Sequence, residues 1–125
     1  MAVPILKQGP FLIATIQAAL TDTDVLQLQD DVMTQVTRHR SRGIIVDVTA
    51  LDVMDSFVSR SLQGISRMTR LRGAMTVIVG IQPEVAFAMV QLGMNFEDVH
   101  TALDLEEGLA FLQQQLNGEQ DSGGG

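Results

Sequence analysis

The residues best suited to chemistry lie together between Asp47 and Phe57. A run of β-branched residues ends at Asp47, and a short loop with Asp52 leads to a helix that is expected to open with Asp55 and Ser56. Loops that follow the strands of an α/β sheet are the usual place for function. In one interpretation Asp55 is an N-cap and Ser56 an ordinary first-turn residue. In the other, Ser56 accepts a phosphate, because free backbone N–H groups and the helix dipole tolerate negative charge.

Most catalytic patterns are absent from the sequence. It contains no Gly-x-Gly-x-x-Gly, no Walker phosphate loop and no nucleophile elbow that would support a Ser-His-Asp triad, and Lys7 is its only lysine. The lack of cysteine excludes disulfides, thiolate zinc sites and cysteine nucleophiles. His39 and His100 belong to different predicted elements, and His100 is interpreted as a surface histidine. We therefore expect no catalytic residue, no cofactor and no metal site.

Composition places the chain among small globular proteins. Its 125 residues are 46% hydrophobic and 18% charged, which is enough apolar material for one core. Eight Lys and Arg against fifteen Asp and Glu give a net charge of −7, which argues against nucleic acid or an anionic membrane as a partner. Neither a membrane-spanning apolar run nor a signal peptide is evident, so the expected location is the cytoplasm.

Hydrophobic spacing, capping residues and glycine or proline signals predict the elements around these residues. In chain order they are strands at 3–6 and 11–16 with a Gly-Pro turn between them, a helix from the capping segment 21–24 to about 40, a strand at 44–48, a helix from 55–56 to just before Gly73, a strand at 74–79, a helix at 84–92, a short strand at 99–102 and a helix from 104. This order predicts an α/β fold with a mostly parallel five-stranded sheet and about four helices. We expect one domain over residues 1–116 and a disordered tail over residues 117–125, which lack apolar side chains.

The segment from Asp47 to Phe57 resembles the signature of STAS domains, the anti-anti-sigma-factor family. It has the order strand, Asp, hydrophobic, Thr, x, hydrophobic, Asp, x, hydrophobic, Asp-Ser-Phe. Three other stretches extend the likeness over nearly the whole body and toward the stressosome scaffold proteins of that family: Ile5-Leu6-Lys7, Gly80-Ile81-Gln82-Pro83 and Thr101-Ala102-Leu103-Asp104-Leu105-Glu106. The resemblance therefore implies the STAS fold.

The same resemblance implies a non-enzymatic regulator of bacterial stress signalling. Such proteins form a large assembly with RsbR-type STAS proteins and sequester a switch serine/threonine kinase of the RsbT type. That kinase phosphorylates the serine of the Asp-Ser motif, here Ser56, and is released to signal downstream; a serine phosphatase resets the site. A homo-oligomer is also expected. Two alternatives remain open: an anti-anti-sigma factor that binds an anti-sigma-factor kinase directly, and a module that binds a small ligand near Ser56.

Nearby residues are assigned roles around this serine. Ser59 is a second candidate acceptor, because it lies three residues beyond Ser56 and therefore on roughly the same side of the helix. Partner contacts are expected at Asp52, Met54, Asp55 and Phe57, because apolar groups beside an exposed polar site commonly anchor a partner. For Met54 and Phe57 packing in the core is an equally good interpretation, since methionine commonly fills gaps in a core.

Overall fold

A computed structural model describes residues 3–97 and 99–123 of the chain. Over these residues the elements follow the order β-β-α-β-α-β-α-β-α, as expected. Their bounds are β1 (Ile5–Gln8), β2 (Phe11–Thr15), α1 (Asp22–His39), β3 (Gly43–Asp47), α2 (Ser56–Leu71), β4 (Met75–Val79), α3 (Pro83–Gln91), β5 (His100–Ala102) and α4 (Leu105–Gly123). The predicted α/β fold is therefore confirmed.

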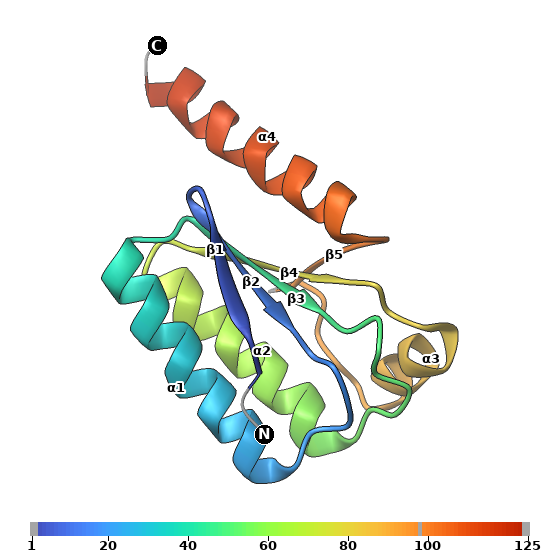
Figure 1. Ribbon diagram of the computed structural model, residues 1–125. Coiled ribbons are helices and arrows are strands. Elements are labelled where there is room, and N and C mark those ends of the chain that lie inside the picture. The colour runs from blue at the N-terminus through green and yellow to red at the C-terminus, as the bar shows by residue number, and fades with distance from the viewer. Residues whose placement is uncertain (1–2, 98, 124–125) are drawn as a thin grey trace.

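The sheet has the strand order β1-β2-β3-β4-β5. β1 pairs antiparallel with β2, and the remaining pairs are parallel. Figure 1 shows α1 and α2 together on one side of the sheet and α4 alone on the other. Because each parallel strand lies beside its predecessor and crossovers are right-handed, the connecting helices α1 and α2 must cover the same face. Helix α4 follows the last strand, so it is free to cover the opposite face.

Two layers of apolar side chains hold this arrangement together. The larger lies between the sheet and helices α1 and α2, and its helix residues follow the 3-and-4 spacing of the sequence: Val25, Leu28, Val32 and Val36 from α1, and Val58, Leu62 and Ile65 from α2. The smaller lies beneath α4 and consists of Phe11, Ile13, Ile45, Val77, Val79 and Leu112. Both faces of the central strands are thus buried, which explains their continuous β-branched runs.

The first strand is displaced from its predicted position. It spans Ile5–Gln8 rather than residues 3–6. The tight turn at Gly9 and Pro10 pairs Gln8 with Phe11, so the ladder of hydrogen bonds extends up to the turn. Val3 is buried although it precedes the strand. The apolar run therefore indicated burial correctly, whereas the turn determines which residues pair.

The expectation of a disordered tail from residue 117 is not met over the described residues, because α4 continues to Gly123. Once a helix is nucleated, each added residue gains a hydrogen bond at little further cost. The side-chain amide of Gln113 also donates a 3.0 Å hydrogen bond to Oδ1 of Asn117. Residues 124 and 125 of the predicted tail lie outside the described residues. No helix within residues 3–97 and 99–123 combines the length and the apolar character needed to cross a membrane.

Candidate functional site

The parallel strands end at one edge of the sheet, which we call the carboxyl edge and define by residues 16, 48, 80 and 103, one after each of β2 to β5. Backbone hydrogen bonds tie these exits together. Ile16 N–H donates to the carbonyl of Asp47 at 3.0 Å, and Val48 N–H donates to the carbonyl of Val79 at 3.0 Å. The loop that leads to Ser56 therefore starts at residues that are hydrogen-bonded to the chain at the ends of both neighbouring strands, β2 and β4.

Asp47 turns the chain out of the sheet. Its Oδ1 accepts hydrogen bonds from the backbone N–H of Thr49 at 2.9 Å and from the Thr49 hydroxyl at 2.6 Å. An aspartate that binds the backbone two residues further on mimics a turn. The carboxylate at the end of β3 is thus used to shape the loop.

The loop after β4 packs against the loop after β3 and is hydrogen-bonded to it. Gly80 has a φ of +76°, and a Cβ at this position would overlap the hydroxyl of Thr49 and lie 3.2 Å from Oδ1 of Asp47. Gln82, the N-cap residue of α3, donates a 2.6 Å hydrogen bond from Nε2 to the backbone carbonyl of Thr49. The two loops can approach this closely because Gly80 has no side chain.

Helix α2 begins with a side-chain cap. Asp55 has extended backbone angles, and its Oδ1 accepts a 2.8 Å hydrogen bond from the backbone N–H of Val58. The predicted N-cap role of Asp55 is confirmed. Ser56 follows as the first residue of the helix, and it is exposed. A cap at Asp55 and an accessible hydroxyl at Ser56 therefore coexist, at the helix end whose dipole favours negative charge.

Ser59 is not on the accessible side. It is 2% exposed, and Ser61 is 7% exposed. The i, i+3 spacing alone suggested that Ser59 shares the exposed side of Ser56. Helix α2, however, contacts both β4 and α1, so the face that it buries is wider than a single stripe and includes Ser59.

The residues that flank Ser56 divide between core and surface. Met54 is 7% exposed and belongs to the larger core layer, and Phe57 is half-buried against that layer. Asp52 and Asp55 are exposed. Of the two interpretations of Met54, the structure therefore supports packing in the core. Sequence reasoning missed Val53, which is 65% exposed in the same loop.

Sequence reasoning also missed the roles of Thr49, Gly80 and Gln82. In the sequence, Gly80 indicates the end of a strand and Pro83 the first turn of a helix, and the Gly-Ile-Gln-Pro stretch also belongs to the resemblance, but none of this assigns Gln82 a partner. No local signal identifies Thr49 as the residue that Gln82 reaches.

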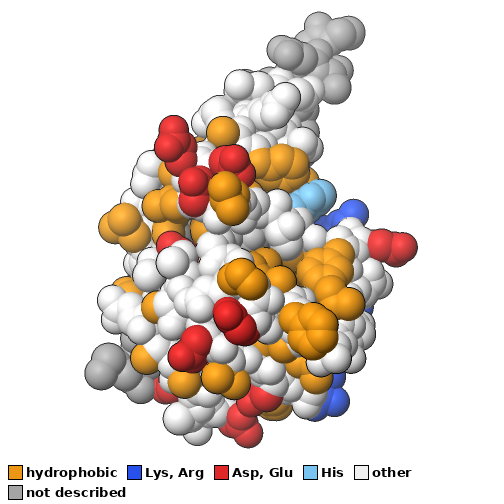
Figure 2. Space-filling model, turned by 90° about the vertical axis from the view of Figure 1, so that its right-hand side faces the viewer, with side chains coloured by type: hydrophobic (Ala, Val, Ile, Leu, Met, Phe, Trp, Pro, Cys, Tyr) orange, Lys and Arg blue, Asp and Glu red, His pale blue; other side chains and the backbone are white. Residues whose placement is uncertain are grey.

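The carboxyl edge is acidic and carries apolar side chains. Exposed carboxylates here include Asp52 and Asp55 in the loop before α2 and Glu84 in the first turn of α3. The exposed large apolar residues of these loops and of α3 are Val53, Phe87, Val90 and Leu103, and Leu92 and Phe96 are exposed in the segment that leads from α3 to β5. Figure 2, which views the molecule from the α3 end, shows acidic and hydrophobic side chains interspersed. Across the described part of the chain, no group of three or more His, Asp or Glu could hold a metal ion.

Comparisons with known proteins agree with this fold. The STAS domain family model matches residues 2–108. A serine-to-glutamate variant of RsbS from Moorella thermoacetica is 34% identical, with a TM-score of 0.82 over 92% of this chain and 97% of that one. A chain of the stressosome, described as a signal integration and transduction hub, is 33% identical, with a TM-score of 0.76 over 90% of this chain and 98% of that one.

A curated relative extends the comparison to longer proteins. The RsbT co-antagonist protein RsbRA from Bacillus subtilis is 31% identical over 83 residues, which are 66% of this chain and 30% of that protein. The chain therefore spans about a third of the length of this curated relative. Because the family model covers all five strands of the sheet and the Asp-Ser loop, this chain belongs to the STAS domain family.

Proposed function

We propose that the protein is a non-enzymatic, cytoplasmic regulator of the stressosome type. It assembles with RsbR-type STAS proteins and holds a serine/threonine kinase of the RsbT class. The proposal is supported by likeness to RsbS and to a stressosome chain over about nine-tenths of this chain. It is supported further by relatives that are named RsbT co-antagonist proteins.

Within this function Ser56 is the residue that the kinase phosphorylates. One observation carries the assignment: of the hydroxyl groups between residues 49 and 61, only that of Ser56 is both exposed and not donated to a carboxylate. The Thr49 hydroxyl donates to Asp47, and Ser59 and Ser61 are buried. A kinase must enclose the hydroxyl that it modifies, so burial removes the two serines of the helix.

The phosphate acts by adding charge where a partner docks. It brings about −1.5 to −2 charges at pH 7 to a loop that already carries Asp52 and Asp55. The N-terminus of α2 offsets part of this, by about 0.3–1 kcal/mol, so the fold tolerates the modification. A partner surface that fits a neutral serine instead meets bulk and like charge within a desolvated contact, and the bound kinase is released. A serine phosphatase restores the binding state.

The test uses the purified protein and the RsbT-class kinase of the same organism. We expect stoichiometric phosphorylation of the wild-type protein and of Ser59→Ala, and none of Ser56→Ala, by intact-mass spectrometry. Modification of Ser56→Ala at the wild-type level would refute the assignment. If the protein binds an anti-sigma-factor kinase and not the RsbT-class kinase, the direct anti-anti-sigma function replaces the stressosome function.

A further inference from the structure

Helix α3 is apolar on both of its sides. Val85 and Met89 are buried against the rest of the domain. On the outward side, exposed apolar residues recur at i, i+3, i+4 and i+7, and we call them the α3 face: Pro83, Ala86, Phe87 and Val90. A helix that is hydrophobic all round is typical of buried positions. The α3 face therefore has the composition of a surface that a partner covers.

The outward sides of the two longer helices on the other flank of the molecule are different. Exposed residues of α1 include Asp30 and Arg38, and Arg60 is exposed on α2. Within Pro83–Gln91, by contrast, Glu84 is the only charged residue. Charged side chains make an outward helix face soluble, and α3 has almost none.

The α3 face is part of a larger apolar surface. Nine large apolar side chains are exposed in the described part of the chain, and six of them lie on α3, in the segment that follows it or in the neighbouring loops: Val53, Phe87, Val90, Leu92, Phe96 and Leu103. Phe87 is 67% exposed and Val90 is 68% exposed. Large exposed apolar surfaces of this kind mark sites of protein interaction.

The charge around the α3 face is negative. All eight Lys and Arg lie within residues 1–72. Figure 2 shows carboxylates among the hydrophobic side chains of this side of the molecule, and Lys and Arg only at its margin. A two-fold contact between two copies through the α3 face would bring Glu84 near its own counterpart, and like charges in an interface are unfavourable. The face therefore fits a different partner, one whose apolar groups are surrounded by Lys and Arg.

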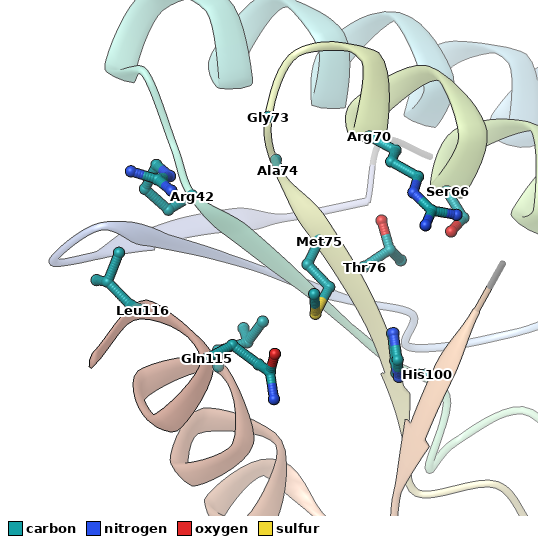
Figure 3. Close-up of a pocket in the computed structure, with 11 residues that line it drawn as sticks. Arg42, Ser66, Arg70, Gly73, Ala74, Met75, Thr76, His100, Gln115 and Leu116 are labelled. Atoms are coloured by element: carbon teal, nitrogen blue, oxygen red, sulfur yellow. The ribbon is translucent and has the colours of Figure 1, made fainter. Parts of the chain in front are cut away.

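The cations of this chain lie mostly at the opposite edge of the sheet, the amino edge, which we define by residues 10, 42, 74 and 99, one before each of β2 to β5. A cavity of about 250 Å³ opens there beside Met75, because the pairing of β5 with β4 begins only at residues 77 and 100. Figure 3 shows the cavity's Arg42 and Arg70 on opposite sides of Met75, so they do not converge on one ligand. The stronger candidate for a binding surface is therefore the α3 face.

We propose that the α3 face is a docking surface for the kinase, separate from the hydroxyl that the kinase modifies; this inference rests on the function proposed above. The hydrogen bond from Gln82 to Thr49 joins the start of α3 to the loop that leads to Ser56. With a rise of about 1.5 Å per residue, Phe87 and Val90 lie about 8 and 12 Å along the helix from Gln82. A stable interface takes about 20–30 residues from each partner, more than residues 48–57 supply. A kinase that encloses Ser56 must therefore also contact neighbouring surface, and the α3 face is apolar and adjacent.

The first test compares Phe87→Ala with Leu71→Ala. Leu71 is the last residue of α2 and is 87% exposed, so both variants shorten an exposed apolar side chain and should keep the unfolding midpoint of the wild-type protein. Kinase binding is measured by calorimetry and phosphorylation by initial rates. We expect Phe87→Ala to weaken binding about tenfold and to raise KM by a similar factor at unchanged kcat, because docking stabilises the bound ground state and the transition state equally. Leu71→Ala should change neither.

The second test concerns the charge around the α3 face. Glu84→Gln should weaken kinase binding about threefold at low ionic strength and reduce its dependence on salt, because long-range attraction between opposite charges is screened by salt. Asp30→Asn removes the same charge from an exposed position in the middle of α1 and should have little effect. Equal effects of Glu84→Gln and Asp30→Asn would show that only the net charge matters, which would contradict a local docking surface.

The outcomes distinguish this inference from the function on which it rests. If the kinase neither binds nor phosphorylates the wild-type protein, the proposed function is wrong, and the docking surface with it. If the wild-type protein is phosphorylated on Ser56 and Phe87→Ala has the same affinity and KM, the docking surface alone is refuted. It is also refuted if Phe87→Ala leaves kinase binding unchanged and instead abolishes self-association or assembly with an RsbR-type protein in light scattering, since the occupant is then another STAS domain.

Discussion

The side-chain amide of Gln82 donates a 2.6 Å hydrogen bond to the backbone carbonyl of Thr49, 33 residues earlier in the chain. This contact joins the loop that precedes α3 to the loop that presents Ser56. The same two loops meet a second time where Gly80 lies against the hydroxyl of Thr49. The position of Ser56 is therefore coupled to the start of α3, and not only to its own helix.

Replacing Gln82 with alanine should loosen the Ser56 loop without unfolding the domain. The loss of one hydrogen bond costs about 0.5–1.5 kcal/mol of stability, and amide hydrogen exchange over residues 48–55 should accelerate. Gln63→Ala is the matched control, since Nε2 of Gln63 also donates to a distant backbone carbonyl, that of Asn95 at 3.1 Å. The control should lose similar stability and leave exchange in residues 48–55 unchanged. Equal exchange rates in the two variants would contradict the coupling.

Gly80→Ala should destabilise the protein more than Gly73→Ala does. Both glycines have positive φ, +76° and +80°, so both substitutions incur the strain of the left-handed region, about 1–2 kcal/mol. Around Gly73 a Cβ would meet nothing within 4 Å, whereas at Gly80 it would overlap Thr49. We expect the additional cost at Gly80 to be about 1–3 kcal/mol, measured by urea denaturation. Equal losses of stability in Gly80→Ala and Gly73→Ala would show that Thr49 can move away from the added Cβ without cost.

Substitutions of Asp55 should distinguish the effect of its N-cap hydrogen bond from the effect of its negative charge. Asp55→Ala removes the hydrogen bond to the Val58 N–H and should cost about 0.5–2 kcal/mol. Asp55→Asn retains an oxygen acceptor and should be nearly as stable as the wild-type protein. If Asp55 also contacts the kinase through its charge, Asp55→Asn weakens kinase binding at unchanged stability. A large loss of stability in Asp55→Asn would show that the charge itself, and not the cap, stabilises α2.

Ser56→Asp should fold as the wild-type protein does and bind the kinase less tightly. The residue is exposed at a helix N-terminus, so the change in stability should stay within about 0.5 kcal/mol. Aspartate has one charge and a shorter reach than phosphoserine, so it should reproduce only part of the effect of phosphorylation. Thr34→Asp, an exposed position on α1, controls for net charge. The local mechanism is wrong if both variants weaken kinase binding equally, as measured by calorimetry.

Much of the fold and part of the site could be predicted from local patterns. The helix spacing of Val25, Leu28 and Val32, the cap at Asp55 and the turn at Gly9 all depend on residues within a few positions of one another. Hydrogen bonds and steric limits at this range are the same in almost any protein. For that reason the element order, the mostly parallel sheet and the exposed start of α2 at Ser56 followed from the sequence.

Other features depend on which elements become neighbours in space. Ser59 is buried because α2 packs on both β4 and α1, and a single helix's periodicity does not reveal the second neighbour. The bond from Gln82 to Thr49 and the cavity beside Met75 form where separate loops and helices meet at the two edges of the sheet. Close contacts of this kind are determined by the packing of the whole domain, so only the tertiary structure shows them.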